Sequence, residues 1–333
     1  MAIAWRKFVD IVAQHESFLL TTHERADCDA IGSELALAAA LESLGKQVRI
    51  VNADPVPPHI AFVDRHQKIE VLGEHVLASD LVGSEVDVII VVDTSAWQQI
   101  GAMGEVVKLS SAKRVVIDHH ASGDDMGAEM FKNDAAEANG RLILEAIEAL
   151  GVTLTEEMAT NLFTAIATDT GWFRFSAVGS ATFRALEKLV SAGAVPTEVF
   201  AALYERNSVE RVRLHGRVMA GMELVSEGRL AHASVTQSDF EATEAKPSDT
   251  EDVVNRLLSV LGVEAAAIFV ELGPELIKVS LRSRTDLDVR QVAQEFGGGG
   301  HRAAAGVRIA QPLTEARQRV LDAMRQAMEQ SGE

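Results

Sequence analysis

Short apolar runs alternate with helix-like segments along the first half of the chain. The apolar runs cover residues 18–22, 48–52, 86–92 and 115–117. The third run, VDVIIVV, is nearly continuous and rich in β-branched residues, which is typical of a strand buried on both faces. Segment 32–45 has a helical pattern and ends at Gly45, a residue that commonly follows a helix C-terminus. This alternation predicts a parallel sheet with helices on both faces.

The rest of the chain predicts a linker and a second domain. Helical patterns continue at about 138–150, 155–169, 180–192 and 197–225, and we interpret the last of these as the linker. A second alternating region begins near Arg229, with strands predicted at about 230–235, 265–271 and 276–282 and helices at about 249–261 and 288–296. The sequence therefore predicts an α/β protein with a cleft between two domains. Its parts are an N-terminal parallel-sheet domain at 1–195, a helical linker at 196–226 and a smaller C-terminal α/β domain at 227–333.

Length and charge limit the number of domains and the ligands that the chain can be expected to bind. A chain of 333 residues suits two domains, and 47% hydrophobic with 24% charged residues is ordinary for a globular protein. The 31 basic and 49 acidic residues give a net charge of −18. This charge argues against binding of long nucleic acid, which requires a basic surface to neutralise many phosphates. A small anion held by a few arginines or by metal ions is compatible with it.

Cysteine content and hydropathy indicate the compartment. Cys28 is the single cysteine, which excludes a disulfide framework and is compatible with a reducing environment. Charges interrupt the apolar residues of segment 1–16 too early for a signal peptide. No run approaches the roughly 18 apolar residues of a membrane span. We therefore expect a cytoplasmic protein with no membrane partner.

Three of the predicted strands end in residues that can bind a metal ion. His23 follows the first run, Asp93 follows the third, and Asp118, His119 and His120 follow the fourth. A single Asp after a strand is more often a turn residue or helix cap. Because the carboxyl ends of parallel strands share one edge of a sheet, three such ends favour a common site.

The segment after the first strand concentrates three potential ligands, His23, Asp27 and Asp29. Such crowding is costly unless a cation compensates it. Histidine with carboxylates and no thiolate suits a divalent ion such as Mn²⁺ better than structural zinc. In an extended backbone Asp27 and Asp29 would point the same way and Cys28 the opposite way, so we interpret Cys28 as a packed small residue.

Asp169 is predicted at the C-terminal end of a helix, where a carboxylate faces the negative end of the helix dipole. It could be a solvated helix end capped by Gly171. The apolar and aromatic neighbours Phe163, Trp172 and Phe173 argue against free solvation. We therefore predict a buried carboxylate with a metal partner.

Four consecutive glycines at 297–300, followed by His301 and Arg302, mark the second domain. They are compatible with a flexible loop, but they also allow backbone N–H groups to approach an anion. Arg282 and Arg284 supply guanidinium groups suited to phosphate, or else form a solvated strand end. Segment 281–308 has five arginines and three acids, a local charge of +2 in an acidic chain. We predict substrate contacts at Arg282, Arg284, Gly298, Gly299, Gly300 and His301.

Together these motifs resemble the DHH phosphoesterases with a DHH-associated C-terminal domain. The matching motifs are His23-x-x-x-Asp27-x-Asp29-x-x-Gly32-Ser33, Asp93 in VVDTS, Asp118-His119-His120, Asp169 in ATDTGWF, and Gly298-Gly-Gly-His301-x-x-Ala304-Ala-Gly306. The resemblance covers nearly the whole chain in the right order. Length and layout are most similar to the bacterial branch that degrades nano-RNA and dephosphorylates 3′-phosphoadenosine 5′-phosphate (pAp).

The resemblance implies roles for these residues. One Mn²⁺ would be held by His23, Asp27 and Asp93, and a second by Asp29, Asp93, His119 and Asp169, with Mg²⁺ or Co²⁺ as substitutes. Two such ions clamp the attacking and leaving oxygens of a displacement at phosphorus. His120 would contact the scissile phosphate and Asp118 would orient the histidines. The implied substrates are short oligoribonucleotides and pAp but not long nucleic acid, and a homodimer is compatible with the family.

Two alternatives and two departures from the family pattern accompany this prediction. The same scaffold serves phosphodiesterases of cyclic or linear signalling dinucleotides. A non-catalytic nucleotide-binding module is the other alternative, although the complete ligand set argues against it. The family often has Pro where this chain has Ala26, and many relatives have Ser-Thr-Gly-Glu near 138–141, where this chain reads Ala-Asn-Gly-Arg. The second departure predicts an effect of Arg141 on substrate preference if that segment touches the site.

Overall fold

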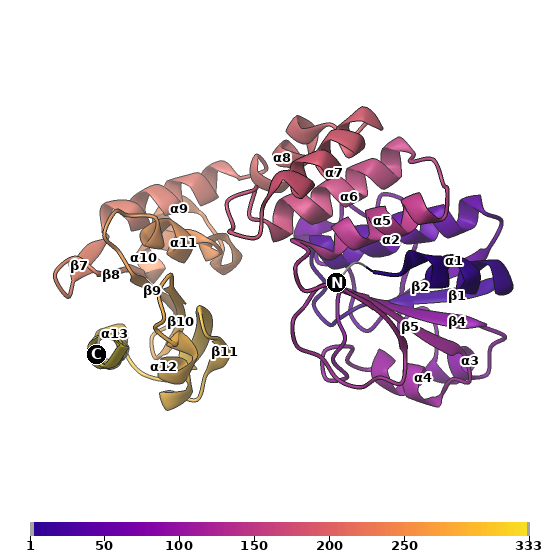
Figure 1. Cartoon of the computed structure of the whole chain (residues 1–333). Coiled ribbons are helices and arrows are strands. Elements are labelled where there is room, and N and C mark those ends of the chain that lie inside the picture. The colour runs from indigo at the N-terminus through magenta and orange to yellow at the C-terminus, as the bar shows by residue number, and fades with distance from the viewer. Residues whose placement is uncertain (1–2, 332–333) are drawn as a thin grey trace. The chain divides into compact units, whose positions relative to one another are not determined.

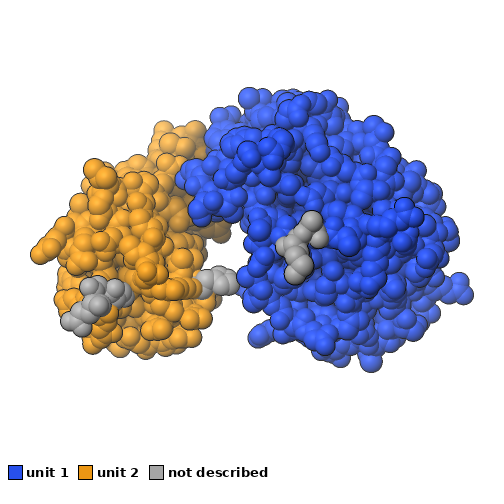
Figure 2. Space-filling view, in the orientation of Figure 1, with its two compact units in different colours: residues 1–206 blue, residues 207–333 orange. Residues whose placement is uncertain are grey.

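The computed structural model describes residues 3–331 and divides the chain into two compact units, Met1–Arg206 and Asn207–Glu333 (Figure 2). The division falls inside the segment expected as a helical linker. Helix α8 (Pro196–Tyr204) belongs to the first unit, and helix α9 (Val209–Ala220) belongs to the second. No helix in the described part of the chain is both long and apolar enough to cross a membrane.

A six-stranded parallel sheet forms the centre of the N-terminal unit. Its strands lie in the order β3-β2-β1-β4-β5-β6, and every neighbouring pair is parallel. Strand order reverses between β1 and β4, so their carboxyl ends form the switch point where open α/β sheets commonly bind ligands. The strands are β1 (Ser17–Thr21), β2 (Gln47–Asn52), β3 (Ile69–Val71), β4 (Val88–Val92), β5 (Lys113–Asp118) and β6 (Glu129–Lys132).

Helices cover both faces of this sheet, as predicted (Figure 1). One face carries α1 (Trp5–Gln14), α2 (Cys28–Ser43), α5 (Asn139–Ala149) and α6 (Glu156–Asp169), and α7 (Ser180–Ser191) packs on α6. The opposite face carries α3 (Ala78–Val82) and α4 (Met103–Leu109). Strand β4 is fully buried because Val88, Ile90 and Val92 face the first helix layer while Ile89 and Val91 face the second. A short 3-10 helix, η1 (Pro58–Ile60), lies in the β2–β3 connection.

The C-terminal unit is built on a second six-stranded sheet, of order β11-β12-β10-β9-β8-β7. Only β8 and β9 pair in parallel, and the other described pairs are antiparallel. The strands are β7 (Glu223–Val225), β8 (Leu230–Val235), β9 (Ala265–Gly273), β10 (Leu276–Ser283), β11 (Gly299–His301) and β12 (Ala304–Ile309). Helices α12 (Val289–Glu295) and α13 (Leu313–Ser331) cover one face, and α9, α10 (Gln237–Thr243) and α11 (Val253–Leu258), with η2 (Pro247–Thr250), cover the other.

Candidate functional site

The three predicted strand ends meet at the switch point of the N-terminal sheet. Strands β1, β4 and β5 are direct neighbours, and His23, Asp93 and His119 follow their carboxyl ends. Asp93 lies at the centre: its Oδ2 is 3.4 Å from His23 Nε2 and its Oδ1 is 3.4 Å from His119 Nε2. Asp93 also has φ 61°, a left-handed conformation that few non-glycine residues adopt. The backbone is therefore held in an uncommon geometry at the residue that joins the two sides of the site.

Two groups of potential metal ligands share this centre. In the first, ligand atoms of His23, Asp27 and Asp93 lie within 4.8 Å of one another. In the second, atoms of Asp29, His119 and Asp169 do so. His119 Nε2 lies 3.7 Å from Asp29 Oδ2 and 3.6 Å from Asp169 Oδ2. All six residues that the sequence singled out as ligands are thus brought together.

The local backbone around Asp27 and Asp29 differs from the extended segment predicted from the sequence. Helix α2 begins at Cys28, four residues earlier than predicted, and Asp27 is its N-cap. Asp27 Oδ1 accepts hydrogen bonds from the N–H groups of Asp29 and Ala30, at 2.9 and 3.1 Å. Aspartate is among the best N-cap residues, which explains the earlier start. Cys28 is buried, as predicted, and burial raises the pKa of its thiol to about 12.

Asp29 is held by the N-terminus of a different helix. The N–H groups of Asn139 and Gly140 donate to its two carboxylate oxygens at 2.6 and 2.7 Å. These are the first residues of α5, so the carboxylate accepts from otherwise unpaired amides at the positive end of the helix dipole. Gly140 is required here because a Cβ would lie 2.7 Å from Ala165 Cβ and 3.3 Å from Asp29 Oδ1.

Asp118 orients His120 but not His119. Its Oδ1 is 2.8 Å from His120 Nδ1 and accepts from the His120 backbone N–H at 3.0 Å. Its Oδ2 accepts from Ser95 Oγ at 2.6 Å and pairs with Lys132 Nζ at 3.0 Å. The sequence-based expectation that Asp118 orients both histidines is therefore wrong for His119, whose Nδ1 faces the carbonyl of Ala136 at 3.3 Å.

The charges at the site are unbalanced without a cation. Burial raises the pKa of Asp27, Asp29 and Asp169, and the neighbouring carboxylates raise those of Asp27 and Asp29 further; the pKa of Asp169 is about 6. Burial opposes the charged form of His23 and His119, but their carboxylate neighbours raise their pKa to about 9 and 10. Asp93 Oδ1 is buried and accepts no hydrogen bond from the part of the chain that the structure describes. An imidazole and carboxylate donor set with an unsatisfied central oxygen fits a divalent ion such as Mn²⁺.

A buried network behind His23 was missed by the sequence analysis. Glu34 is fully buried, and its Oε2 accepts from Asn52 Nδ2 at 2.8 Å. Asn52 Oδ1 in turn accepts from the backbone N–H of Thr22 at 3.2 Å, directly before His23. Burial raises the pKa of Glu34 to about 8. Glu34 follows the Gly-Ser motif, but nothing in a single sequence separates it from the other helical glutamates.

In the C-terminal unit, Arg282 and Arg284 lie at the end of β10. Arg282 is partly buried, donates to the carbonyl of Leu281 at 3.0 Å, and makes no ion pair within the described residues. Burial lowers its pKa. Arg284 donates to the carbonyl of Leu258. In register, Arg282 lies opposite Ala304, and Ala304 lies opposite His301, whose side chain falls outside the described residues.

The glycine-rich segment has internal structural reasons for its composition. A Cβ at Gly298 would lie 2.4 Å from the carbonyl oxygen of Gly306, and one at Gly300 would lie 2.5 Å from that of Ala304. The Gly298 N–H already donates to Ala293 at 2.8 Å. Gly297 and Gly299 are open on their Cβ sides, although Gly297 has a left-handed φ of 82°. Close pairing with β12 thus accounts for Gly298 and Gly300, whichever ligand the segment contacts.

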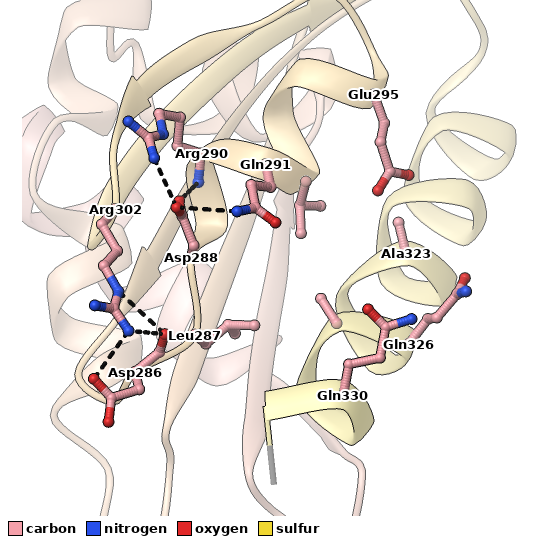
Figure 3. Close-up of a pocket in the computed structure, with 12 residues that line it drawn as sticks. Asp286, Leu287, Asp288, Arg290, Gln291, Glu295, Arg302, Ala323, Gln326 and Gln330 are labelled. Atoms are coloured by element: carbon pink, nitrogen blue, oxygen red, sulfur yellow. Dashed lines mark hydrogen bonds and ion pairs between the residues drawn. The ribbon is translucent and has the colours of Figure 1, made fainter. Parts of the chain in front are cut away.

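A separate pocket of about 690 Å³ lies between α12 and α13 of this unit (Figure 3). Its arginines are already paired within the described residues: Arg302 donates to the carbonyl and carboxylate of Asp286, and Arg290 pairs with Asp288. Neither Arg282 nor Arg284 lines it. The guanidinium groups predicted to bind substrate therefore lie outside this pocket.

Comparison with known proteins identifies the family of this chain. The model of the DHH family, N-terminal domain, matches residues 17–167, and that of the DHHA1 domain matches residues 228–330. A Thermus thermophilus protein named "bifunctional oligoribonuclease and PAP phosphatase NrnA" is 31% identical over 94% of this chain and 90% of its own length. The chain belongs to the DHH family of phosphoesterases.

Two further known proteins are similar to this DHH protein. An exopolyphosphatase-related protein from Bacteroides fragilis has a similar structure, with a TM-score of 0.87, 25% identity, and coverage of 99% of this chain and 97% of that one. The cyclic-di-AMP phosphodiesterase GdpP of Geobacillus thermodenitrificans is 26% identical over 95% of this chain. This chain spans only 48% of that longer protein.

The second departure from the DHH pattern now has a structural context. Segment 138–141 touches the site through its backbone, since the N–H groups of Asn139 and Gly140 hold Asp29. The side chain of Arg141 pairs instead with Glu137 at 3.4 Å and Glu145 at 2.9 Å. The Arg141 side chain therefore forms ion pairs with two acidic residues that lie four positions before and after it in the sequence.

Proposed function

We propose that this DHH protein is a Mn²⁺-dependent phosphoesterase that hydrolyses short oligoribonucleotides to mononucleotides and pAp to AMP and phosphate. One observation carries the proposal: two ligand groups converge on Asp93 with His120 beside them, in a chain 31% identical to the Thermus NrnA protein. His120 Nδ1 is 3.9 Å from Asp93 Oδ1, and His120 forms a third group of possible ligands with Asp93 and His119. We assign His120 to the substrate because Asp118 already holds its Nδ1 and about half of the side chain is exposed.

The ligand residues would hold two divalent ions. His23, Asp27 and Asp93 would bind one ion, and Asp29, Asp93, His119 and Asp169 would bind the other. When bound, such ions supply charge stabilisation for an in-line displacement at phosphorus and lower the pKa of water. The protein's own contribution is to hold four carboxylates close together, through the N-cap of α2 and the first turn of α5. Mg²⁺ or Co²⁺ can replace Mn²⁺ in a site of this donor set.

His120 acts on the substrate. Its contact with Asp118, although opposed by burial, raises the pKa of the imidazole, so a larger fraction carries a proton near neutral pH. A protonated imidazole next to the scissile phosphate stabilises developing charge or donates a proton to the leaving oxygen. Asp118 keeps this proton on the ring and sets the ring orientation through Nδ1.

The C-terminal unit supplies binding groups for the rest of the substrate. We assign this role to Arg282, Arg284, Gly298, Gly299, Gly300 and His301. Arg282 supports the assignment because its guanidinium is partly buried and forms no ion pair within the described residues, which favours an anion. Recognition through one or two phosphates suits short substrates, because an acidic chain gains little from a long nucleic acid.

A second candidate activity is hydrolysis of cyclic or linear signalling dinucleotides. The 26% identity to GdpP over 95% of this chain favours it. Both activities use the same ligand groups, so the site geometry is compatible with either one.

An assay with purified protein and Mn²⁺ distinguishes the two candidate activities. The protein is incubated with pAp, a linear diribonucleotide and a cyclic dinucleotide, and kcat/KM is measured for each substrate. We expect turnover of pAp and the linear diribonucleotide, with the cyclic compound hydrolysed far more slowly. Comparable turnover of the cyclic compound would reverse the ranking.

Two variants test whether the site performs the reaction. His120→Ala should reduce kcat by at least about 100-fold, the usual contribution of a positioned acid or base. His66→Ala removes an exposed histidine remote from the ligand groups and should leave kcat unchanged. A fully active His120→Ala protein would refute the role of His120.

A further inference from the structure

The turn that follows Asp169 has an unusual backbone. Gly171, Trp172 and Phe173 have φ values of 56°, 56° and 64°, three consecutive left-handed residues. Hydrogen bonds close the turn: the N–H of Trp172 donates to Ala167 at 2.7 Å, and that of Arg174 donates to Thr170 at 3.0 Å. Left-handed bulky residues are uncommon and cluster at functional sites.

Two of the aromatic residues in this turn are anchored in the domain core. Trp172 and Phe173 pack edge-on against Phe163 of α6, with ring centroids 5.9 and 6.2 Å apart. Trp172 also stacks on Phe200 of α8 at 5.3 Å. These contacts fix the turn and account for both rings. Phe175, the remaining aromatic side chain of the turn, takes part in none of these ring contacts.

Phe175 is 56% exposed and makes no ring contact within the described residues. Its ring lies against Gly171, where a Cβ would approach the Phe175 ring to 2.7 Å. Gly171 is two residues from Asp169, so their Cα atoms are at most about 7 Å apart. The exposed ring is therefore held close to a metal-ligand carboxylate, at a separation that one nucleotide can span.

Arg174 adds a cation to the same turn. Its Nε donates to the Gly171 carbonyl at 2.7 Å, which holds the side chain over the turn, and it makes no ion pair within the described residues. An arginine without an acidic partner is notable in a chain with 49 acidic and 31 basic residues. A cation and an exposed ring together suit a ligand with a phosphate and an aromatic base.

We propose that the 171–175 turn is a nucleobase subsite in which Phe175 stacks on the base of the nucleotide whose phosphate lies at the ligand groups. In this subsite Arg174 pairs with a second phosphate of the same substrate. The inference rests on the proposed function and deepens it, because it names the part of the substrate that the N-terminal unit recognises. Stacking is tolerant of base identity, so the subsite selects nucleotides over base-free phosphate esters.

The test compares pAp with ribose 3′,5′-bisphosphate, which has the same phosphates but no base. Stacking is worth about 1–3 kcal/mol per base, so Phe175→Ala should lower kcat/KM for pAp about 5- to 150-fold. The same variant should leave kcat/KM for the base-free compound unchanged. Phe175→Leu should behave like Phe175→Ala, because it keeps apolar area but not the ring, and Phe175→Trp should restore turnover of pAp.

Two further variants complete the comparison. Phe183→Ala removes a similarly exposed ring, at 57%, whose contact with the turn is to Phe173, with ring centroids 6.0 Å apart. This variant controls for loosening of the turn and should leave kcat/KM for both substrates unchanged. Arg174→Gln should lower kcat/KM for both substrates by the same factor, because both substrates have the second phosphate. Equal losses on the two substrates for Phe175→Ala, or full activity of Phe175→Leu, would overturn the stacking role, and an unaffected Arg174→Gln would overturn the role of the arginine.

A binding measurement separates this inference from the proposed function. If the wild-type protein hydrolyses neither compound, the proposed pAp phosphatase activity fails. Calorimetric titration with AMP then decides the subsite by itself. Weaker AMP binding by Phe175→Ala but not by Phe183→Ala supports it, and equal binding by all three proteins overturns it.

Discussion

At the scale of single residues, the two histidines of the Asp118-His119-His120 motif have different contacts. His119 faces Asp29, Asp93 and Asp169, whereas His120 is bound by the carboxylate of Asp118. Burial opposes ionisation of Asp118, but hydrogen bonds from His120 and Ser95 and the Lys132 ammonium keep its pKa well below the usual range. Asp118 is thus charged near neutral pH.

Asp118→Asn should therefore act through His120. The amide keeps the shape but removes the charge that raises the pKa of His120, so the alkaline limb of the kcat profile should move to lower pH. Loss of such a supporting carboxylate typically costs 10- to 100-fold in activity. The pH–rate profile of pAp hydrolysis measures both effects, with the exposed Asp125→Asn as control. An unshifted alkaline limb would contradict the role of Asp118.

Glu34 and Asn52 give a second prediction at this scale. Because the pKa of Glu34 is about 8, its carboxyl is largely neutral at pH 7, and Glu34→Gln should change the free energy of unfolding little. Asn52→Leu instead leaves Glu34 and the Thr22 N–H without their partner. It should destabilise the protein by about 1–3 kcal/mol and weaken Mn²⁺ binding. Denaturant unfolding and metal titration measure these changes; equal losses in both variants would disprove the distinction.

The ionisable groups of the site also predict how stability depends on pH. Asp169, Glu34, His23 and His119 have raised pKa values of about 6, 8, 9 and 10. A raised pKa contributes stability that is complete below the ordinary pKa and is lost as pH rises through the raised value. The Tm of the metal-free protein should therefore fall between about pH 5 and pH 10. Because ligands must lose protons to bind a metal, Mn²⁺ should raise Tm more at pH 8.5 than at pH 6.

At the scale of elements, helix ends set the geometry of the carboxylates. Asp27 caps α2, and the first amides of α5 bind Asp29. Helix α2 also crosses α6 closely, since a Cβ on Gly32 would lie 2.5 Å from the carbonyl oxygen of Asn161. The family glycine at this position is thus explained by helix packing rather than by contact with a ligand.

Gly140→Ala should displace the N-terminus of α5. The added methyl would lie 2.7 Å from Ala165 Cβ, and overpacking of this kind costs about 1–3 kcal/mol. Because the shift also moves the amides that bind Asp29, Mn²⁺ affinity should fall with stability. Gly216→Ala, in open space on α9, should instead stabilise the protein by about 0.5–1 kcal/mol. Unchanged Mn²⁺ affinity in Gly140→Ala would contradict the link between α5 and the site.

The sequence predicted the buried strands well and the peripheral elements poorly. Strands β1, β4 and β5 were predicted because most of their residues are apolar and buried. Strand β2 was predicted from its apolar residues, although Gln47 and Arg49 are exposed. The edge strands β3 and β6 were missed because they are short and partly polar. Helix α13 was missed because only a narrow stripe is apolar, including Val320, Met324 and Met328. The ligand residues could be predicted because each follows a buried strand or lies at the end of a helix. The hydrogen-bond partners of Asp29 and Asp118 could not be predicted, because these contacts join residues far apart in the chain.

At the scale of the whole molecule, every ligand residue belongs to one unit. Segment 1–206 contains both ligand groups and the entire parallel sheet. We expect a fragment of residues 1–206 to fold and bind Mn²⁺ with an affinity near that of the full chain, but to lose affinity for pAp with Arg282 and Arg284. Circular dichroism and calorimetry measure these properties. A folded fragment with full affinity for pAp would exclude a role of the C-terminal unit in substrate binding.

The order of the ligands along the chain has a consequence for synthesis. The ribosome adds residues from the N-terminus, so His23, Asp27 and Asp93 emerge long before Asp169, the last residue of α6. The amides that bind Asp29 and the α6 surface that supports Gly32 also arrive late. A nascent chain therefore exposes its first aspartates without the partners that balance them. Under the proposed function, loading of the second ion waits until translation has passed residue 169 and α6 has folded onto α2.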